Sequence, residues 1–136
     1  GFFHADEIDI AVELVDEHLA HGAASGYYFV FVEIANELAG YACYGPIPCT
    51  KTAFDLYWIA VEPNYQRHGL GRLLVSEVEK RIASVGGDRI YIDTSGRPDY
   101  APTRAFYERS GFRRAADLAG FYAPGVDRVT YAKLLQ

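Results

Sequence analysis

The chain has 136 residues, of which 50% are hydrophobic and 15% aromatic, and this suits one domain with a packed core. The composition excludes a disordered or low-complexity protein. The formal net charge of −5 argues against a nucleic-acid-binding protein, because a phosphate backbone is held mainly by clustered Lys and Arg. No apolar run approaches the length of a membrane span, so we expect no membrane partner.

The first half of the chain is predicted to form a helix followed by three strands. Ile8–Leu19 has hydrophobic residues at helical spacing and acidic residues between them, which is typical of an amphipathic helix. Tyr27–Ala35 and Leu38–Tyr44 are rich in β-branched and aromatic residues, and the Asn36-Glu37 step between them indicates a hairpin. Phe54–Val61 is predicted to be a third strand of the same sheet.

The second half alternates between helices and strands. Hydrophobic residues at helical spacing run through Arg72–Ser84, and Arg89–Thr94 is a strand pattern. A short helix with Pro102 in its first turn is expected to end near Ser110. Arg113–Leu118 and Arg128–Leu135 are expected to pair as closing strands. This order indicates an α/β fold with a mixed sheet, in one domain over residues 1–136.

The loop Gln66–Gly71 lies between the third predicted strand and the long predicted helix. Its two glycines, Gly69 and Gly71, allow the backbone to approach a ligand, and the helix N-terminus that follows attracts anions. A Walker A loop is excluded because Arg72 follows the second glycine where a lysine is required. A dinucleotide fingerprint is excluded because Leu74 stands where a third glycine is required. The loop therefore predicts a phosphate site of another kind.

Two motifs resemble those of the GNAT N-acyltransferase superfamily. The first is this Q-x-x-G-x-G loop after a strand, and the second is Ala101–Phe112, which contains a tyrosine, an acidic residue and a Gly-Phe pair in the family's order. The resemblance implies a mixed, mostly antiparallel sheet flanked by helices, with a splayed strand pair that binds acyl-CoA. It also implies an N-acetyltransferase with acetyl-CoA as co-substrate and no metal.

The resemblance further implies roles for single residues. Tyr107 falls on the tyrosine that protonates the departing thiolate, although beside Phe106 and Phe112 it could also be a core residue. Tyr100 stands where the family often has an asparagine that contacts the cofactor, so it either bonds the cofactor arm or closes the pocket. The backbone that would bind the arm and the pyrophosphate consists of Ile59, Ala60, Val61, Gln66, Arg67, His68, Gly69, Leu70, Gly71 and Arg72.

Asp55 is the candidate general base, because several family members carry an acidic residue six positions before the end of this strand. It could equally be a solvated carboxylate, and Glu33, Glu62 or a water molecule are alternatives. Strict alternation would put the members of the third strand on two faces. Those expected on one face are Asp55, Tyr57, Ile59 and Val61, and those on the other are Leu56, Trp58 and Ala60.

The acceptor is predicted to be a small, partly apolar amine. The family usually builds its acceptor site from the loops that correspond to Tyr44–Thr52 and Gly120–Gly125, which are aromatic and nearly uncharged here. The tyrosines expected to converge on this site are Tyr44, Tyr57, Tyr91 and Tyr122. Three stretches resemble a bacterial branch that acetylates D-alanine or a similar small amino acid: Ala24–Tyr27, Gly40–Gly45 and Asp55–Trp58. An amino-acid carboxylate would need a cation, and Arg97 or Arg104 could supply it.

Other functions and the surroundings of the protein stay open from the sequence. A catalytically silent acyl-CoA-binding module and a protein lysine acetyltransferase are the alternatives to a small-molecule enzyme. The family usually has a strand and a helix ahead of the one predicted at Ile8–Leu19, where only Gly1–Ala5 stands here. This leaves a sheet edge that a second subunit could fill in a homodimer. Cys43 and Cys49 are expected to be reduced, and the start of the chain lacks a secretory signal pattern, which indicates the cytoplasm.

Overall fold

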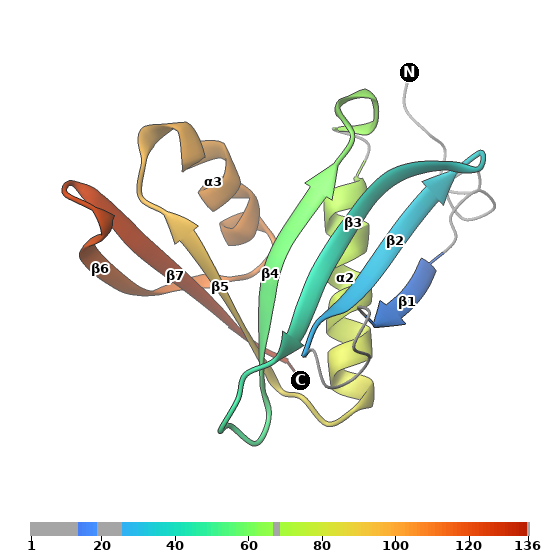
Figure 1. Cartoon of the computed structure of the whole chain (residues 1–136), viewed down its shortest axis with the longest axis horizontal. Coiled ribbons are helices and arrows are strands. Elements are labelled where there is room, and N and C mark those ends of the chain that lie inside the picture. Colours follow the sequence, from blue (N-terminus) through green and yellow to red (C-terminus); the bar gives the residue numbers. More distant parts are fainter. Residues whose placement is uncertain (1–13, 19–25, 67–68, 136) are drawn as a thin grey trace.

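The computed structural model describes residues 14–18, 26–66 and 69–135. Within these residues it has a seven-stranded sheet in the order β1-β2-β3-β4-β5-β7-β6, flanked by helices α2 and α3 (Figure 1). The fold class predicted from the sequence is thereby confirmed. In chain order the elements are β1 (Leu14–His18), β2 (Tyr28–Ile34), β3 (Glu37–Pro46), β4 (Ala53–Val61), η2 (Pro63–Tyr65), α2 (Leu70–Ser84), β5 (Arg89–Ser95), η3 (Pro98–Tyr100), α3 (Ala101–Arg109), β6 (Arg113–Ala123) and β7 (Val126–Leu134).

The strand β1 corrects the sequence-based prediction for the start of the chain. Leu14–His18 pairs antiparallel with β2, from Leu14 opposite Val32 to His18 opposite Tyr28, so the helix expected over Ile8–Leu19 is wrong for these five residues. The rest of that helix lies outside the described residues. The outer edge of β2 offers a row of backbone hydrogen-bonding groups, and pairing with them outweighs the helical spacing of a short segment. β1 also fills the sheet edge that the family resemblance had left without a strand.

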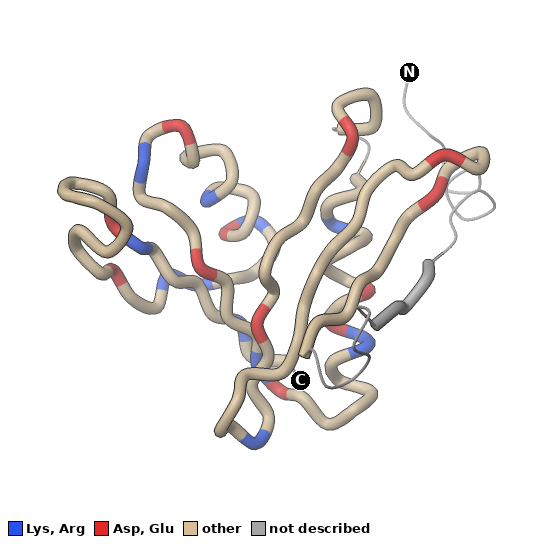
Figure 2. Tube along the Cα trace, viewed as in Figure 1, with Lys and Arg blue, Asp and Glu red and all other residues tan. Residues whose placement is uncertain are grey.

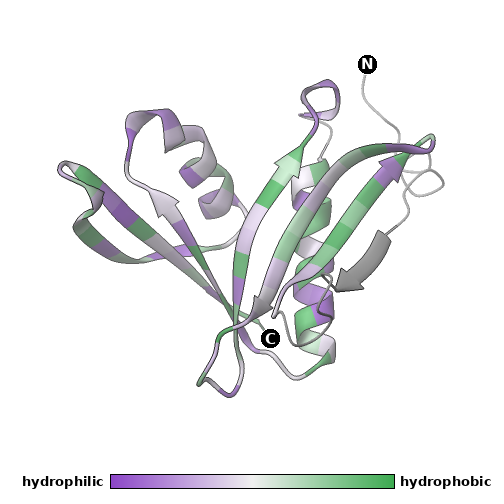
Figure 3. Ribbon diagram, in the orientation of Figure 1, coloured by the Kyte–Doolittle hydropathy of each residue, from purple (hydrophilic) through white to green (hydrophobic). Residues whose placement is uncertain are grey.

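The β2–β3 hairpin was predicted correctly except for the place of its turn. Ala35 and Asn36 have φ values of +52° and +68°, so the turn lies one residue earlier than expected. Positive φ at both central positions is the signature of a type I′ turn, whose twist matches that of paired strands. The hydrophobic positions of β2 and of α2 are green in Figure 3, and they meet in the core. The fully buried core side chains include Val30, Val32, Leu56, Leu70, Leu74, Val78, Ile82, Ile90, Ile92 and Tyr131.

Strands β4 and β5 pair for a short distance and then separate. They are parallel partners only from Ala53 opposite Arg89 to Asp55 opposite Tyr91. Beyond this point they diverge, so the sheet has the shape of a V in Figure 1, with β1–β4 on one arm and β5–β7 on the other. The backbone of β4 after Asp55 therefore has no strand partner on its β5 side. This is the splayed pair that the family resemblance implied.

A β-bulge in β4 overturns the strict alternation expected for this strand. Tyr44 of β3 is opposite Leu56, and Ala42 is opposite Ile59, so three steps on β4 match two on β3 and Tyr57 is the extra residue. Directly opposite residues share a face of the sheet, so Leu56 and Ile59 lie on the same face, which packs against the core. Asp55 consequently lies on the opposite face to Ile59, together with Trp58 and Ala60.

The closing hairpin is longer than predicted. β6 continues through Ala123, so most of the expected loop Gly120–Gly125 is strand, and the turn is confined to Pro124 and Gly125, whose φ is +77°. The register between β6 and β7 shifts twice, and these irregularities let the hairpin twist. A second predicted loop is also shorter in the structure. β3 runs to Pro46, so the loop expected over Tyr44–Thr52 is shorter, and it joins β3 to β4 at the closed end of the V (Figure 1).

Helix α3 is fixed to the sheet by a hydrogen bond from a buried tyrosine to an exposed glutamate. The Tyr131 hydroxyl of β7 donates to Oε2 of Glu108 at 2.7 Å, and the Tyr131 side chain has no exposed surface. Lys133 of the same strand donates to the backbone oxygen of Ser110 and pairs with Glu79 of α2, both at 2.9 Å. Together these contacts hold both helices against one face of the sheet, and they fix the position of Tyr107.

We expect Tyr131→Phe to lower the free energy of unfolding by about 1–3 kcal/mol, because the variant loses a hydrogen bond between a buried hydroxyl and a charged carboxylate. Urea denaturation monitored by far-ultraviolet circular dichroism measures the change. Tyr122→Phe is the matched control, since Tyr122 is about half exposed and has no hydrogen bond among the described residues; it should stay within about 0.5 kcal/mol. Equal stability of both variants would show that the Tyr131–Glu108 bond does not fix α3.

Candidate active site

A cavity of about 650 Å³ occupies the opening of the V, and we call it the wedge cavity. Its walls come from β4, β5, α3 and the tip of the β6–β7 hairpin, so segments distant in the sequence meet there. The residues that line it are Tyr57, Trp58, Ile59, Asp93, Thr94, Ser95, Arg97, Tyr100, Thr103, Tyr107, Tyr122, Ala123 and Val126. Its size suits a small ligand or the reactive end of a larger one.

Tyr107 lies on the wall of the wedge cavity that α3 forms. Its side chain is only 5% exposed and packs against the rings of Phe106, Phe112 and Tyr131. Its hydroxyl group has no hydrogen-bond partner among the described residues. Burial raises the pKa of Tyr107 to about 12, so the phenol is neutral and carries a proton at physiological pH. A buried donor without a protein partner is available to a ligand in the cavity.

Two carboxylates lie on the side of the sheet that the helices do not cover. Asp93 lies midway along β5 and Asp55 near the start of β4. Figure 2 shows an acidic position (red) on each of these strands. Asp93 lines the wedge cavity, whereas Asp55, which forms the last β4–β5 pair with Tyr91, does not line it. The pKa of Asp55 is raised, first by burial and then by the negative charge of Asp93, while Arg128 acts in the opposite direction. Sequence analysis missed Asp93 and Arg128, because neither belongs to a local motif.

The structure brings together some of the tyrosines expected at the acceptor site and separates others. Tyr57, Tyr100 and Tyr122 all line the wedge cavity, at the bulge of β4, before α3 and near the tip of the hairpin. Tyr44 is buried on the core face, where its ring stacks on that of Tyr28, and it does not line the cavity. Tyr91 borders a different cavity, at the closed end of the V. The acceptor-site prediction for Tyr44 and Tyr91 is therefore not supported by their positions.

The glycine-rich loop borders a second cavity of about 460 Å³, which we call the cradle. The cradle lies beside the N-terminus of α2, and the residues that line it include Val61, Gln66, Gly69, Gly71 and Arg72. Glycine is favoured at these two positions for different structural reasons. Gly69 caps α2 with a φ of +83°, which favours glycine. A Cβ atom on Gly71 would lie 3.0 Å from the ring of Phe106, so this glycine permits close contact between α2 and α3. The first backbone N–H groups of α2 have no partner within the helix, and the residues of this first turn, Leu70, Gly71 and Arg72, line the cradle.

Side chains around the cradle mainly hold its shape. The amide of Gln66 donates to the backbone oxygen of Val61 at 3.1 Å, which ties the loop to the end of β4. The Arg72 guanidinium donates to the backbone oxygen of Arg109 at 2.8 Å, which ties α2 to the end of α3. Leu70 is buried in the core and also lines the cradle. Ala60, which pairs with Tyr41, lines neither cavity. Arg67 and His68 lie outside the described residues.

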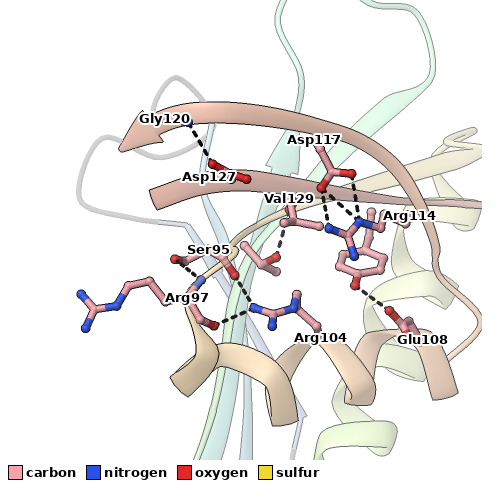
Figure 4. A network of polar contacts seen from close by, with 11 residues as sticks. Ser95, Arg97, Arg104, Glu108, Arg114, Asp117, Gly120, Asp127 and Val129 are labelled. Carbon is pink, nitrogen blue, oxygen red and sulfur yellow. Dashed lines mark hydrogen bonds and ion pairs between the residues drawn. The ribbon is translucent and has the colours of Figure 1, made fainter. Parts of the chain in front are cut away.

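Two arginines beside the wedge cavity have different surroundings. In Figure 4, Arg104 of α3 points at the end of β5, where it donates to the backbone oxygens of Ser95 and Arg97 at 2.7 and 2.9 Å. Its guanidinium thus holds the chain that borders the cavity. Arg97 lines the cavity and pairs with Asp99 at 3.2 Å, where both side chains are largely exposed. Of the two candidate carboxylate binders from the sequence, Arg97 is the one on the cavity wall.

Among residues 14–18, 26–66 and 69–135, no cluster of His, Cys, Asp and Glu could hold a metal ion. Cys43 is buried and Cys49 is exposed, and both are free thiols; burial raises the pKa of Cys43 to about 11. In the part of the chain that the structure describes, no helix is long and apolar enough to span a bilayer. Of the alternative bases, Glu33 and Glu62 line neither the wedge cavity nor the cradle.

Comparison with known proteins finds one matching family and similar solved structures. The sequence profile of the acetyltransferase (GNAT) family matches residues 2–112. A solved structure described as an acetyltransferase of the GNAT family, from Desulfovibrio desulfuricans, is 50% identical with a TM-score of 0.85, and the match covers 88% of this chain and 75% of that one. An aminoglycoside 6′-N-acetyltransferase complexed with coenzyme A is 23% identical, with a TM-score of 0.70 over 82% of this chain and 74% of that one. This second likeness concerns the fold alone.

A match among curated proteins is shorter. The [ribosomal protein bS18]-alanine N-acetyltransferase of Escherichia coli (strain K12) is 34% identical over 67 residues, which are 49% of this chain and 44% of that protein. The match thus spans less than half the length of the curated relatives.

Stability should fall at alkaline pH through the buried tyrosine. The pKa of Tyr107 is about 12 in the folded protein and about 10 when unfolded, so the unfolded state loses its proton first and stability decreases as pH rises from about 10 to 12. A two-unit shift corresponds to about 2–3 kcal/mol. Urea denaturation at several pH values should show a smaller decrease in Tyr107→Phe than in the unaltered protein. The difference between the two proteins removes the contribution of Cys43, and equal slopes would contradict the burial of the phenol.

Proposed function

Because this chain belongs to the acetyltransferase (GNAT) family, we propose that it transfers an acetyl group from acetyl-CoA directly to the primary amine of a small molecule. The observation that carries the proposal is the buried hydroxyl of Tyr107 on the wall of the wedge cavity, which has no hydrogen-bond partner in the described part of the chain. A neutral phenol at this point can protonate a leaving thiolate. No metal takes part in the proposed reaction.

The proposed route of acetyl-CoA runs from the cradle to the wedge cavity along β4. The pyrophosphate would be bound by the free N–H groups at the start of α2, where the first turn has no acidic residue to repel it. Val61 lines the cradle and Ile59, two residues earlier on β4, lines the wedge cavity, so this strand connects the two spaces. The β5 side of β4 is unpaired beyond Asp55, and its backbone groups can bond the amides of the pantetheine arm as another strand would. Tyr100 lies beside this route.

The reaction follows from these groups. The acceptor ammonium first gives one proton to a base, for which we propose Asp55 acting through a water molecule, since Asp55 does not itself line the cavity. The amine nitrogen then attacks the thioester carbon and forms the C–N bond, while an unpaired N–H of β4 stabilises the oxyanion. When the C–S bond breaks, the sulfur takes the proton of Tyr107, and the amide nitrogen loses its second proton to restore the phenol. The products are an acetylated amine, free CoA and one proton.

Within the class of small amines, an amino acid such as D-alanine is a candidate acceptor. Tyr57 and Tyr122 would contact its carbon atoms, and Arg97 would bind its carboxylate by exchanging its exposed partner Asp99. The relatives act, by their names, on aminoglycosides and on a ribosomal-protein alanine, so both kinds of amine belong in a test panel. A silent acyl-CoA-binding module and a lysine acetyltransferase are the other outcomes. We propose the cytoplasm as the compartment, consistent with two free thiols.

The first experiment measures CoA thiol release with acetyl-CoA and a panel of D- and L-amino acids, small amines, an aminoglycoside, and peptides with a free alanine N-terminus or a lysine. Tyr107→Phe should lower kcat by about 10²- to 10⁴-fold on the best acceptor, because the leaving thiolate loses its acid. Its affinity for CoA, measured by calorimetry, should hardly change. Tyr91→Phe, on β5 but outside the wedge cavity, is the matched control and should keep its activity. Tight CoA binding without thiol release would indicate the silent module.

Asp55→Asn should remove the low-pH limb of the rate profile. As a base, Asp55 works only when deprotonated, so kcat/KM of the unaltered enzyme should rise with pH through the pKa of Asp55, which lies above its ordinary value of about 4. The variant should be slower and should lack that limb. Asp117→Asn, in an exposed ion pair with Arg114, should retain it. An unchanged limb in Asp55→Asn would assign the base to water or to another group.

A further inference from the structure

We propose that Asp93 is the residue that binds the protonated amine of the acceptor in the wedge cavity, with Thr130 and Arg128 as its positioning residues. This deepens the proposed function and rests on it for the identity of the ligand as an acceptor. The carboxylate lies midway along β5, on the wall of the cavity and on the side of the sheet that the helices leave uncovered.

The hydrogen bonds of Asp93 leave one of its oxygens available. Oδ1 accepts from the Thr130 hydroxyl at 2.8 Å and pairs with Nε of Arg128 at 3.4 Å. Oδ2 has no partner among the described residues. The two neighbours thus fix the orientation of the carboxylate through one atom, and the other atom can accept a hydrogen bond from a ligand. A charged donor gives the stronger kind of hydrogen bond, which favours an ammonium group.

The hairpin fixes these neighbours in turn. Thr130 is directly opposite Asp93 in the β5–β7 ladder, so backbone pairing sets its distance. The guanidinium carbon of Arg128 lies 4.6 Å from the centre of the Phe121 ring of β6, which restrains the long side chain. With Arg128 30% and Asp93 44% exposed, their ion pair contributes little to stability. A purely structural role therefore accounts poorly for this arrangement.

The charge around Asp93 favours a cation. Asp55 and Asp93 both act on this side of the sheet, and Arg128 is the cation that influences both of them. Two carboxylates facing one guanidinium leave a net negative charge next to the cavity. The cation that lines the cavity, Arg97, has Asp99 as its partner. An ammonium ion entering the cavity would balance the remaining charge.

An independent observation shows that the same cavity is built for a polar ligand. Tyr107 is 95% buried, and its hydroxyl has no partner among the described residues while its ring forms part of the cavity wall. A buried donor without a partner is costly unless a ligand or water satisfies it. Tyr57, Tyr100 and Tyr122 line the same cavity as this hydroxyl and Asp93, and their aromatic rings suit an alkylammonium ion. The acceptor amine would thus reach the cavity charged, with Asp93 at its nitrogen.

Ethylammonium, with ethanol as the uncharged probe of similar size, tests the site directly. Titrated into the ¹⁵N-labelled full chain, alone and with coenzyme A, ethylammonium should give saturable amide shifts in residues 93–95 and 128–130, and ethanol should not. Asp93→Asn, which keeps the shape of the side chain, should weaken ethylammonium binding by about 10- to 100-fold. Asp117→Asn, the matched control in another exposed Asp–Arg pair, should bind as the unaltered protein does. Thr130→Val should weaken binding less than Asp93→Asn, and Thr130→Ser should restore it.

The kinetic counterpart uses the thiol-release assay with ethylamine as acceptor. Asp93→Asn should raise KM for ethylamine about tenfold or more and leave KM for acetyl-CoA within about twofold. Absence of saturable shifts in the unaltered protein, or equal affinity in Asp93→Asn, would overturn the assignment of Asp93 even if transfer occurs. Intact ethylammonium shifts without thiol release from any amine would instead overturn the proposed transferase and support the ammonium site.

Discussion

The separation of β4 from β5 after three residue pairs is the constraint on which the rest of this structure depends. Parallel strands normally pair along their length, and an unpaired backbone is costly unless another group satisfies it. Here the bulge at Tyr57 turns β4 away, and Arg104 bonds the backbone oxygens at the end of β5, so that the two strands do not close on each other. The opening provides both the wedge cavity and a strand edge along which an extended cofactor arm can bind.

Helix α3 links the stability of the fold to the chemistry of the site. Its Phe106 packs on Gly71 at the start of α2, while the next residue, Tyr107, faces the wedge cavity. Glu108, the third in succession, is bonded by Tyr131 of β7. Three consecutive side chains therefore contact the cradle, the cavity and the sheet. A shift of this helix would disturb the cofactor site and the proposed acid together, which explains why its end is bonded to both Arg72 and Lys133.

The two ends of the wedge cavity offer opposite electrostatic environments. The side near α3 is apolar and aromatic, so the pKa of Tyr107 is raised to about 12 and its proton is retained. The side near the β6–β7 hairpin carries Asp93, with Arg128 as its partner and the half-buried Asp55 nearby. A retained phenolic proton on one side and carboxylates on the other are the arrangement needed for an acid and a base at the same pH. The proposed acetyl transfer would take place between them.

The sequence alone determined the features that depend on neighbours along the chain. The glycine loop before α2, the helix with Tyr107, the β2–β3 hairpin and the splayed family architecture were all predicted, because turn residues, helical spacing and local motifs encode them. Only the tertiary structure decided on which face of the sheet Asp55 lies, that Tyr44 is excluded from the cavity, and that Leu14–His18 is a strand. It also brought Asp93 next to Arg128 and Thr130. These features all depend on strand register, since they include a bulge, an edge pairing and a contact between residues more than thirty positions apart. Register is fixed when whole strands pair, and neighbouring residues along the chain do not determine it.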